Sequence, residues 1–266
     1  MPRFTFENAT EITKQNFEEF SEKAKLDALQ KELLNPDFLP THEHIKNALG
    51  KVLWDDEDLW LKFCRNKEFP VYELFNEEYV EALAEYCIER TKEYRASKEN
   101  PLVILEIGAG NGRLSHFLGQ KLEEHAPGQT KIIATDSGEW NLKKDSFVES
   151  LAHKEALEKY KPAIVISSWM PLGKDFTQDI RNSKGVQEYI LIGEADGGCC
   201  GDNWKTWGIS EEGEKTPPYE KDGFVRENLD EVGEKQVCRT DCFDDFLKGD
   251  LRHSSTVSFR RKRESL

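Results

Sequence analysis

Short apolar runs separated by polar segments dominate the second half of the chain. The runs begin at Leu102, Lys131, Ala163 and Tyr189, and each leads into acidic, serine or glycine residues. Runs of this length and composition are typical of strands that are buried on both faces. Four of them, with helical or loop segments between, predict a parallel sheet covered by helices on both sides.

The first hundred residues have apolar positions at helical spacing instead. Helices are predicted at 9–34, 44–53, 57–64 and 76–95. The polar stretch 97–101 then predicts a linker. We therefore expect a helical N-terminal extension, residues 1–100, followed by a nucleotide-binding core, residues 101–266.

The chain after the fourth run is more irregular. The glycine-rich stretch 197–203 predicts a loop. A short helix is predicted at 223–232, and strands are predicted at 235–240 and 253–260. We expect these two strands to pair as an antiparallel hairpin.

A glycine-rich turn follows the first apolar run, in the sequence LEIGAGNGR. Gly108, Gly110 and Gly112 stand at every second position, and a helical pattern begins at Leu114. Glycine tolerates positive φ and brings backbone N–H groups close to a ligand at a helix N-terminus. The spacing is neither G-x-G-x-x-G, since Arg113 takes the last position, nor a P-loop. Taken alone, the turn suits a nucleotide cradle and a ligand-free βα connection equally well.

Acidic residues end the first two predicted strands. Glu106 precedes the glycines, and Asp136 ends the run that begins at Lys131. An acid at the end of the second strand of such a sheet accepts hydrogen bonds from ribose hydroxyls. The alternative for Asp136 is a turn residue, because Asp-Ser-Gly also favours a tight turn.

This combination resembles motif I and the second-strand acid of the class I (Rossmann-like) S-adenosylmethionine-dependent methyltransferases. The resemblance covers roughly residues 100–262. It implies an α/β fold with a seven-stranded, mostly parallel sheet, helices on both faces and a final antiparallel hairpin. It also implies S-adenosylmethionine as cofactor, and an N-terminal extension that forms a lid and part of the substrate pocket. The alternative is an extension that only packs on the sheet.

The resemblance also assigns a cofactor site. The cofactor-binding residues that it implies are Glu106, Gly108, Gly110, Gly112, Asp136, Ser137, Glu149, Ser150 and Ser167. Among these, Glu106 is implied to face the methionine amino group and Asp136 the ribose. Glu149 falls at the adenine edge, where the family often has Asp, and Trp140 is a candidate cover for the adenine.

The methyl acceptor is less clearly indicated. Candidate substrate residues are Ser168, Trp169, Met170 and Trp204. The loop after the third apolar run reads Ser-Ser-Trp-Met-Pro, unlike the Asn/Asp-Pro-Pro-aromatic signature of enzymes that methylate amide or nucleobase nitrogens. Aromatic faces beside acids suit a small cationic or aromatic amine, although Trp204 and Trp207 equally suit packing of a loop onto the core. The sequence singles out no histidine as a general base.

Charge and cysteine content narrow the class of protein. With 37 basic and 51 acidic residues, the formal net charge is −14, which disfavours a nucleic-acid substrate. No apolar run has the length of a membrane span, and no secretory signal is recognised. We therefore expect a cytoplasmic protein with no membrane contact. Its six cysteines are expected to be thiols, and their spacing does not predict a metal site.

The leading hypothesis is a methyltransferase that acts on an N, O or S nucleophile of a small-molecule acceptor. A protein methyltransferase is the first alternative, because the helical extension offers a docking surface. A non-catalytic module that binds S-adenosylmethionine is the second. A nicotinamide-dependent oxidoreductase is a weaker rival.

Overall fold

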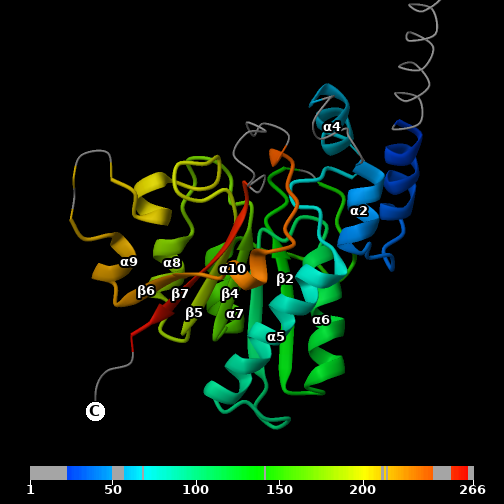
Figure 1. Cartoon of the computed structure of the whole chain (residues 1–266). Coiled ribbons are helices and arrows are strands. Elements are labelled where there is room, and N and C mark those ends of the chain that lie inside the picture. The colour runs from blue at the N-terminus through cyan, green and yellow to red at the C-terminus, as the bar shows by residue number, and fades with distance from the viewer. Residues whose placement is uncertain are drawn as a thin grey trace, which may run out of the picture.

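The computed structural model describes residues 23–49, 57–67, 69–140, 142–210, 213, 215–241 and 253–262. These residues contain a seven-stranded sheet with the order β3-β2-β1-β4-β5-β7-β6 (Figure 1). The strands are β1 Leu102–Ile107, β2 Thr130–Asp136, β3 Glu149–Ser150, β4 Ile164–Ser168, β5 Glu188–Gly193, β6 Phe224–Asn228 and β7 Ser255–Arg261. Neighbours from β3 to β5 are parallel, whereas β7 is antiparallel to β5 and β6. The predicted Rossmann-like α/β sheet, mostly parallel and with an antiparallel end, is confirmed.

One strand of the antiparallel end was predicted wrongly. Residues 224–228 form β6 and not part of a helix over 223–232, and residues 235–240 contribute an isolated bridge, Glu73 to Cys238, in place of a strand. The last predicted strand is confirmed as β7. Strand β6 lies at the sheet edge with Phe224 buried and the following residues largely facing solvent, so it lacks the apolar run of a central strand. Pairing with β7 sets its conformation.

Helices cover both faces of the sheet, as predicted. They are α5 Glu77–Glu93, α6 Arg113–His125, α7 His153–Tyr160, α8 Thr177–Asn182, α9 Pro218–Lys221 and α10 Asp230–Gly233. Because successive strand residues point to opposite faces, neighbouring residues enter different hydrophobic layers. Ile190 packs in the layer with α5, α6 and α10, and Leu191 packs in the layer with α7, α8 and α9.

The described helices before α5 share a hydrophobic cluster separate from the two layers on the sheet. Residues 23–33 form a helix, followed by α2 His42–Leu49 and α4 Glu57–Cys64, which lie together at the top of Figure 1. Their cluster centres on buried Trp60 and includes Val237 of the C-terminal half. Residues 9–22 and 50–53 of the predicted helices lie outside the described residues. In the described ranges, no helix has both the length and the apolar character of a membrane span.

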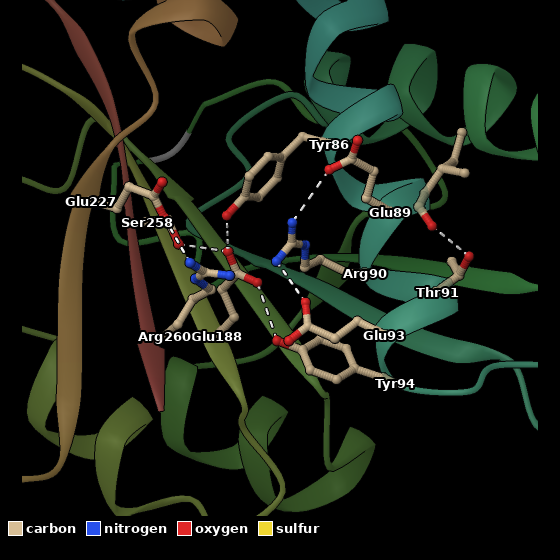
Figure 2. Close-up of polar contacts among 11 residues, drawn as sticks. Tyr86, Glu89, Arg90, Thr91, Glu93, Tyr94, Glu188, Glu227, Ser258 and Arg260 are labelled. Carbon is tan, nitrogen blue, oxygen red and sulfur yellow. Dashed lines mark hydrogen bonds and ion pairs between the residues drawn. The ribbon is translucent and has the colours of Figure 1, made fainter. Parts of the chain in front are cut away.

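Helix α5 is attached to the sheet through a buried carboxyl group at the start of β5 (Figure 2). Glu188 Oε1 accepts hydrogen bonds from Tyr86 Oη at 2.5 Å and from Ser258 Oγ at 2.6 Å. Its Oε2 accepts a longer one, 3.3 Å, from Tyr94 Oη. Burial raises the pKa of Glu188, and the bonds from Ser258 and Tyr86 oppose that rise. These contacts join the helix to two strands and fix its position on the sheet.

We predict that Tyr86→Phe lowers the free energy of unfolding by about 1–3 kcal/mol, because a short bond to a buried carboxyl group is lost. Tyr94→Phe is the matched control. It removes the longer bond to the same group and should cost less. Urea unfolding of both variants measures the difference, and an equal or larger cost for Tyr94→Phe would contradict the role given to Tyr86.

Candidate functional site

Three strand ends meet at one edge of the sheet because β1 lies between β2 and β4. Glu106 is in parallel register with Ala134 of β2 and with Ile166 of β4. The loops that follow these strands therefore leave the sheet side by side, at the edge where open α/β sheets bind ligands. A cavity of about 500 Å³ is lined by these loops and by residues 69–75 of the N-terminal extension.

The turn after β1 exposes two of its three glycines to this cavity. Gly108, Gly110 and Gly112 have φ angles of 69°, 57° and 87°, a conformation that favours glycine. A Cβ atom at Gly108 would meet nothing within 4 Å, and one at Gly110 would meet Leu142 at 3.9 Å. A Cβ atom at Gly112 would collide with Val148. Gly112, at the N-cap of α6, is thus required for packing, whereas the first two glycines line the cavity.

Asp136 connects the end of β2 to the same turn. Its Oδ2 accepts a hydrogen bond from Gly110 N at 2.9 Å, and its Oδ1 accepts one from Gly138 N at 2.7 Å. The turn role anticipated for Asp136 is therefore present. A carboxylate has about four acceptor positions, so two backbone donors leave it with capacity for a ligand.

Glu106 is a buried acid on the cavity lining. Its Oε2 accepts hydrogen bonds from Ser115 N at 3.1 Å and from Ser115 Oγ at 2.5 Å, in the first turn of α6. Burial raises the pKa of Glu106 to about 7, against the opposing effect of the Ser115 bonds, and the nearby charge of Asp136 raises it further. The acid before the glycines therefore titrates near neutral pH.

Trp169 holds a strained backbone position on the cavity wall. Its φ of 53° is rare for a bulky residue, and such positions concentrate at functional sites. Its backbone N–H donates to Ile192 O at 2.7 Å, and its indole Nε1–H donates to Glu73 Oε2 at 2.8 Å. The ring centroid lies 5.7 Å from that of Tyr72. These contacts fix the indole at the end of β4.

The cavity brings together most of the predicted site residues. Those on its lining are Glu106, Gly108, Gly110, Asp136, Ser137, Ser167, Ser168, Trp169 and Met170, together with the candidate adenine cover Trp140. Four others, namely Gly112, Glu149, Ser150 and Trp204, lie outside the lining.

The residues outside the lining have other contacts. In β3, Glu149 accepts a hydrogen bond from Lys159 Nζ at 2.5 Å. Trp204 lies in the π-helix η1, Asn203–Trp207, where Lys221 Nζ is 5.8 Å from its ring centroid. Trp207 is buried and donates from Nε1 to Cys200 O at 2.7 Å, which is the core-packing role that the sequence left open for it.

Residues 69–75 form the cavity wall that the N-terminal extension contributes. The sequence predicted such a contribution from residues 1–100 but did not single out this segment. Leu74 N donates to Val237 O at 2.7 Å, and Arg239 N donates to Tyr72 O at 3.0 Å. This segment, FPVYELF, therefore pairs with the C-terminal half of the chain. Its single charged residue, Glu73, stands among apolar neighbours, which is the sequence signal that indicates a buried carboxyl group.

Arg113 links the glycine turn to the N-terminal extension. Its guanidinium donates a hydrogen bond to Phe38 O and lies 4.9 Å from the ring centroid of Phe117 and 5.6 Å from that of Phe69. Burial lowers the pKa of Arg113 to about 10. Arg113, which takes the position of the last glycine of a dinucleotide fingerprint, thus ties the extension to the glycine turn.

No metal centre is formed by the part of the chain that the structure describes, where no three His, Cys, Asp or Glu residues are grouped to hold an ion. The five described cysteines are thiols. Cys199 lines the cavity, and burial raises its pKa to about 11, so it is protonated at neutral pH. Cys242 lies outside the described residues.

Comparisons with known proteins find likeness in structure alone. No family model and no curated protein matches the chain. Among solved structures, it is similar to the DszA carbon methyltransferase, at 13% identity over 96% of this chain and 70% of that one, with a TM-score of 0.44. It is also similar to the CurJ carbon methyltransferase, at 12% identity over 96% and 71%, with a TM-score of 0.42. For the plantazolicin methyltransferase BpumL in complex with SAH, the identity is 12% over 91% and 100%, with a TM-score of 0.34.

We predict that Glu106→Gln changes how stability depends on pH. Between the usual glutamate pKa of 4.5 and about 7, the folded protein keeps a proton on Glu106 that the unfolded chain has lost. Wild-type stability therefore falls as pH rises through this window, and the glutamine variant lacks that fall.

The free energy of unfolding of Glu106→Gln, relative to wild type, should rise by on the order of 3 kcal/mol between about pH 4.5 and pH 8. Urea unfolding across this range measures the difference, and Glu149→Gln, which changes an acid outside the cavity, is the control. A relative stability that stays constant, or falls, would show that Glu106 ionises normally.

Proposed function

We propose that the cavity binds S-adenosylmethionine and that the chain is a methyltransferase acting on a small-molecule acceptor through an N, O or S nucleophile. The observation that carries the proposal is the pair of glycines, Gly108 and Gly110, that line the cavity between two acids, Glu106 and Asp136. The glycines leave room for a ligand against the backbone, and the acids suit the ligand's ammonium and ribose groups.

The polar groups present fit this cofactor. Asp136 keeps acceptor capacity for ribose hydroxyls beyond its two backbone bonds. Both of the bonds from Ser115 go to Oε2 of Glu106, so Oε1 is the oxygen we assign to the methionine ammonium. Trp140 lines the cavity and is 64% exposed, which suits a ring that covers the adenine. When bound, the cofactor supplies an electrophilic methyl group, and the protein orients the reactants and excludes water.

The rest of the predicted site completes the proposal. Ser137 and Ser167 border the same cavity and are assigned to the cofactor, and Ser168, Trp169 and Met170 to the acceptor. Gly112 is assigned an indirect role, because it shapes the turn through packing. Three residues stay in the proposal although none of them lines the cavity. Glu149 and Ser150 are assigned to the adenine edge, and Trp204 is assigned to the acceptor.

The proposal includes the division of the chain. Residues 1–100 serve as a lid and substrate region, and residues 101–266 serve as the cofactor-binding core. Support comes from residues 69–75, which line the cavity, and from the bond of Arg113 to Phe38 O. A cytoplasmic location is in keeping with five thiols, and the net charge of −14 disfavours nucleic acid as a partner.

A protein substrate is the second candidate, and the cavity mouth favours it. Leu172 lines the cavity and is 72% exposed. Exposed large apolar side chains beside a cavity are typical of surfaces that contact a partner. Mass spectrometry of candidate protein partners after incubation with S-adenosylmethionine separates the two acceptor classes.

We predict that Gly108→Ala weakens S-adenosylmethionine binding by tenfold or more, about 1.4 kcal/mol, because the added methyl group enters the cavity floor. The matched control is Gly223→Ala, which also has a positive φ, 81°, with open space around the added Cβ atom but lies outside the lining. Both variants should lose about 1–2 kcal/mol of stability from the left-handed backbone.

Calorimetric titration with S-adenosylmethionine measures both affinities, and the same titration with NAD(H) tests the oxidoreductase alternative. The control should bind S-adenosylmethionine as the wild type does. Wild-type binding to NAD(H) but not to S-adenosylmethionine would overturn the proposed function. Unchanged affinity in Gly108→Ala would place the cofactor elsewhere.

A further inference from the structure

Glu73 is a buried acid on the cavity wall that the cofactor assignment leaves without a role. It lies in the segment that covers the cavity and is 8% exposed. Its Oε2 accepts a hydrogen bond from Trp169 Nε1 at 2.8 Å. Its Oε1 accepts from Ser254 Oγ at 3.0 Å and from Gln236 Nε2 at 3.2 Å. The carboxyl group is therefore held in place from three separate parts of the chain.

These partners leave Glu73 one acceptor position toward a ligand. A carboxylate oxygen has two acceptor positions, and Oε1 uses both of its own. Among the described residues, Oε2 has a single donor, the Trp169 indole. Because Trp169 follows Ser168 at the end of β4 and lines the same cavity, the remaining position on Oε2 belongs to the acceptor side of the site.

The other acids on the lining have different tasks. Glu106 is bonded to Ser115 of α6, and Asp136 is bonded to two backbone N–H groups in the loops after β1 and β2. Glu139 lies at the mouth, 3.7 Å from Lys174 Nζ, with an exposed side chain. No histidine lines the cavity within the described chain. Glu73 is thus the acid that remains for proton transfer at the acceptor.

The surroundings of Glu73 shift its pKa toward neutral pH, where a general base operates. Burial raises the pKa of Glu73 to about 8, the bond from Trp169 opposes this, and the charge of Asp241 adds to the rise. Tyr79, Cys200 and Cys238 also interact electrostatically with Glu73, and burial raises the pKa of each. These three stay neutral near pH 7, whereas the charge of Asp241, a carboxyl group whose own pKa burial raises, acts on Glu73. A general base is most effective when its pKa lies near the operating pH.

We propose that Glu73 is the general base of the acceptor subsite, and that the acceptor is an amine or hydroxyl compound whose nucleophilic atom carries a proton. The proposal rests on the proposed methyltransferase function. A lone pair on the acceptor N or O forms the new bond to the methyl carbon, and the carbon–sulfur bond breaks with its electron pair left on sulfur. The acceptor proton passes to Glu73 Oε2, which then releases it to water.

The aromatic side chains beside Glu73 further restrict the chemical class of the acceptor. Tyr72 and Trp169 present two aromatic rings whose centroids lie 5.7 Å apart, and Phe176 also lines the cavity. An apolar, preferably aromatic, body therefore suits the space around the nucleophile. A thioether or a tertiary amine has no proton to give, and such acceptors fall outside the proposed class.

The test uses two cofactor analogues and needs no acceptor. S-adenosylhomocysteine lacks the methyl group, whereas sinefungin carries a charged amine at the position of the methylsulfonium centre, facing the acceptor. We expect wild-type protein to bind sinefungin roughly 10- to 100-fold more tightly than S-adenosylhomocysteine, because the charged amine forms a charge-assisted hydrogen bond with Glu73. At pH 7, sinefungin should also release about one proton more than S-adenosylhomocysteine, because the amine ionises Glu73. Calorimetry in two buffers of different ionisation enthalpy measures this difference.

Glu73→Gln is expected to keep the affinity for S-adenosylhomocysteine while losing both the preference for sinefungin and the extra proton. Glu188→Gln changes a buried acid outside the cavity lining. It should keep the affinity for S-adenosylhomocysteine, the preference for sinefungin and the extra proton release. If Glu73→Gln retains the preference, or if both affinities fall together, Glu73 is a structural anchor and the proposal is overturned. The wild-type proton count decides the question even where Glu73→Gln does not fold, since an equal count for both analogues refutes it. If wild type binds neither analogue, the proposed function itself fails.

Discussion

The parallel register of β1 between β2 and β4 is the constraint on which the site depends. It places Glu106 beside Ala134 and Ile166, so that the acid, the glycine turn and the ends of both neighbouring strands meet at one cavity. A shift of one residue would exchange the faces of every side chain in β1 and would put Glu106 in the place of Leu105. Each of the two hydrophobic layers buries alternate residues of this strand, so the register decides which layer Glu106 faces. The register of β1 therefore fixes the position of the chemistry.

Burial of the acids has opposite effects on the stability of the fold and on the proposed chemistry. Burial raises the pKa values of Glu73, Glu106 and Glu188, so the folded state favours their protonated forms and loses stability as each ionises. The proposed base, however, works only when Glu73 is ionised. Hydrogen bonds from Trp169, Ser254 and Gln236 reduce this cost. They let the fold hold a base that a fully apolar pocket would keep neutral.

The sequence predicted the elements whose own residues determine their structure. Strands β1, β2, β4 and β5 are apolar enough to be recognised, since helices cover both of their faces, and the acid and glycines at their ends carry the cofactor prediction. Edge strand β6 was missed because its conformation comes from pairing with β7. Glu73 was missed for a related reason. Its role depends on Trp169, Gln236 and Ser254, which lie far from it in the sequence, and no local spacing reports such contacts.

The two halves of the cavity come from different parts of the chain. The proposed cofactor half is formed by the loops after β1 and β2, which Asp136 and Gly110 join directly. The proposed acceptor half is formed where residues 69–75 meet the loop after β4 and residues 239–240. The two halves touch where the Arg113 guanidinium lies 5.6 Å from the Phe69 ring centroid, whereas Tyr72 and Glu73 contact Arg239 and Trp169 instead. Substitutions at Tyr72 or Glu73 would therefore change the proposed acceptor half with little effect on the proposed cofactor half. Such an arrangement would let acceptor preference change while the sheet and its glycine turn stay the same.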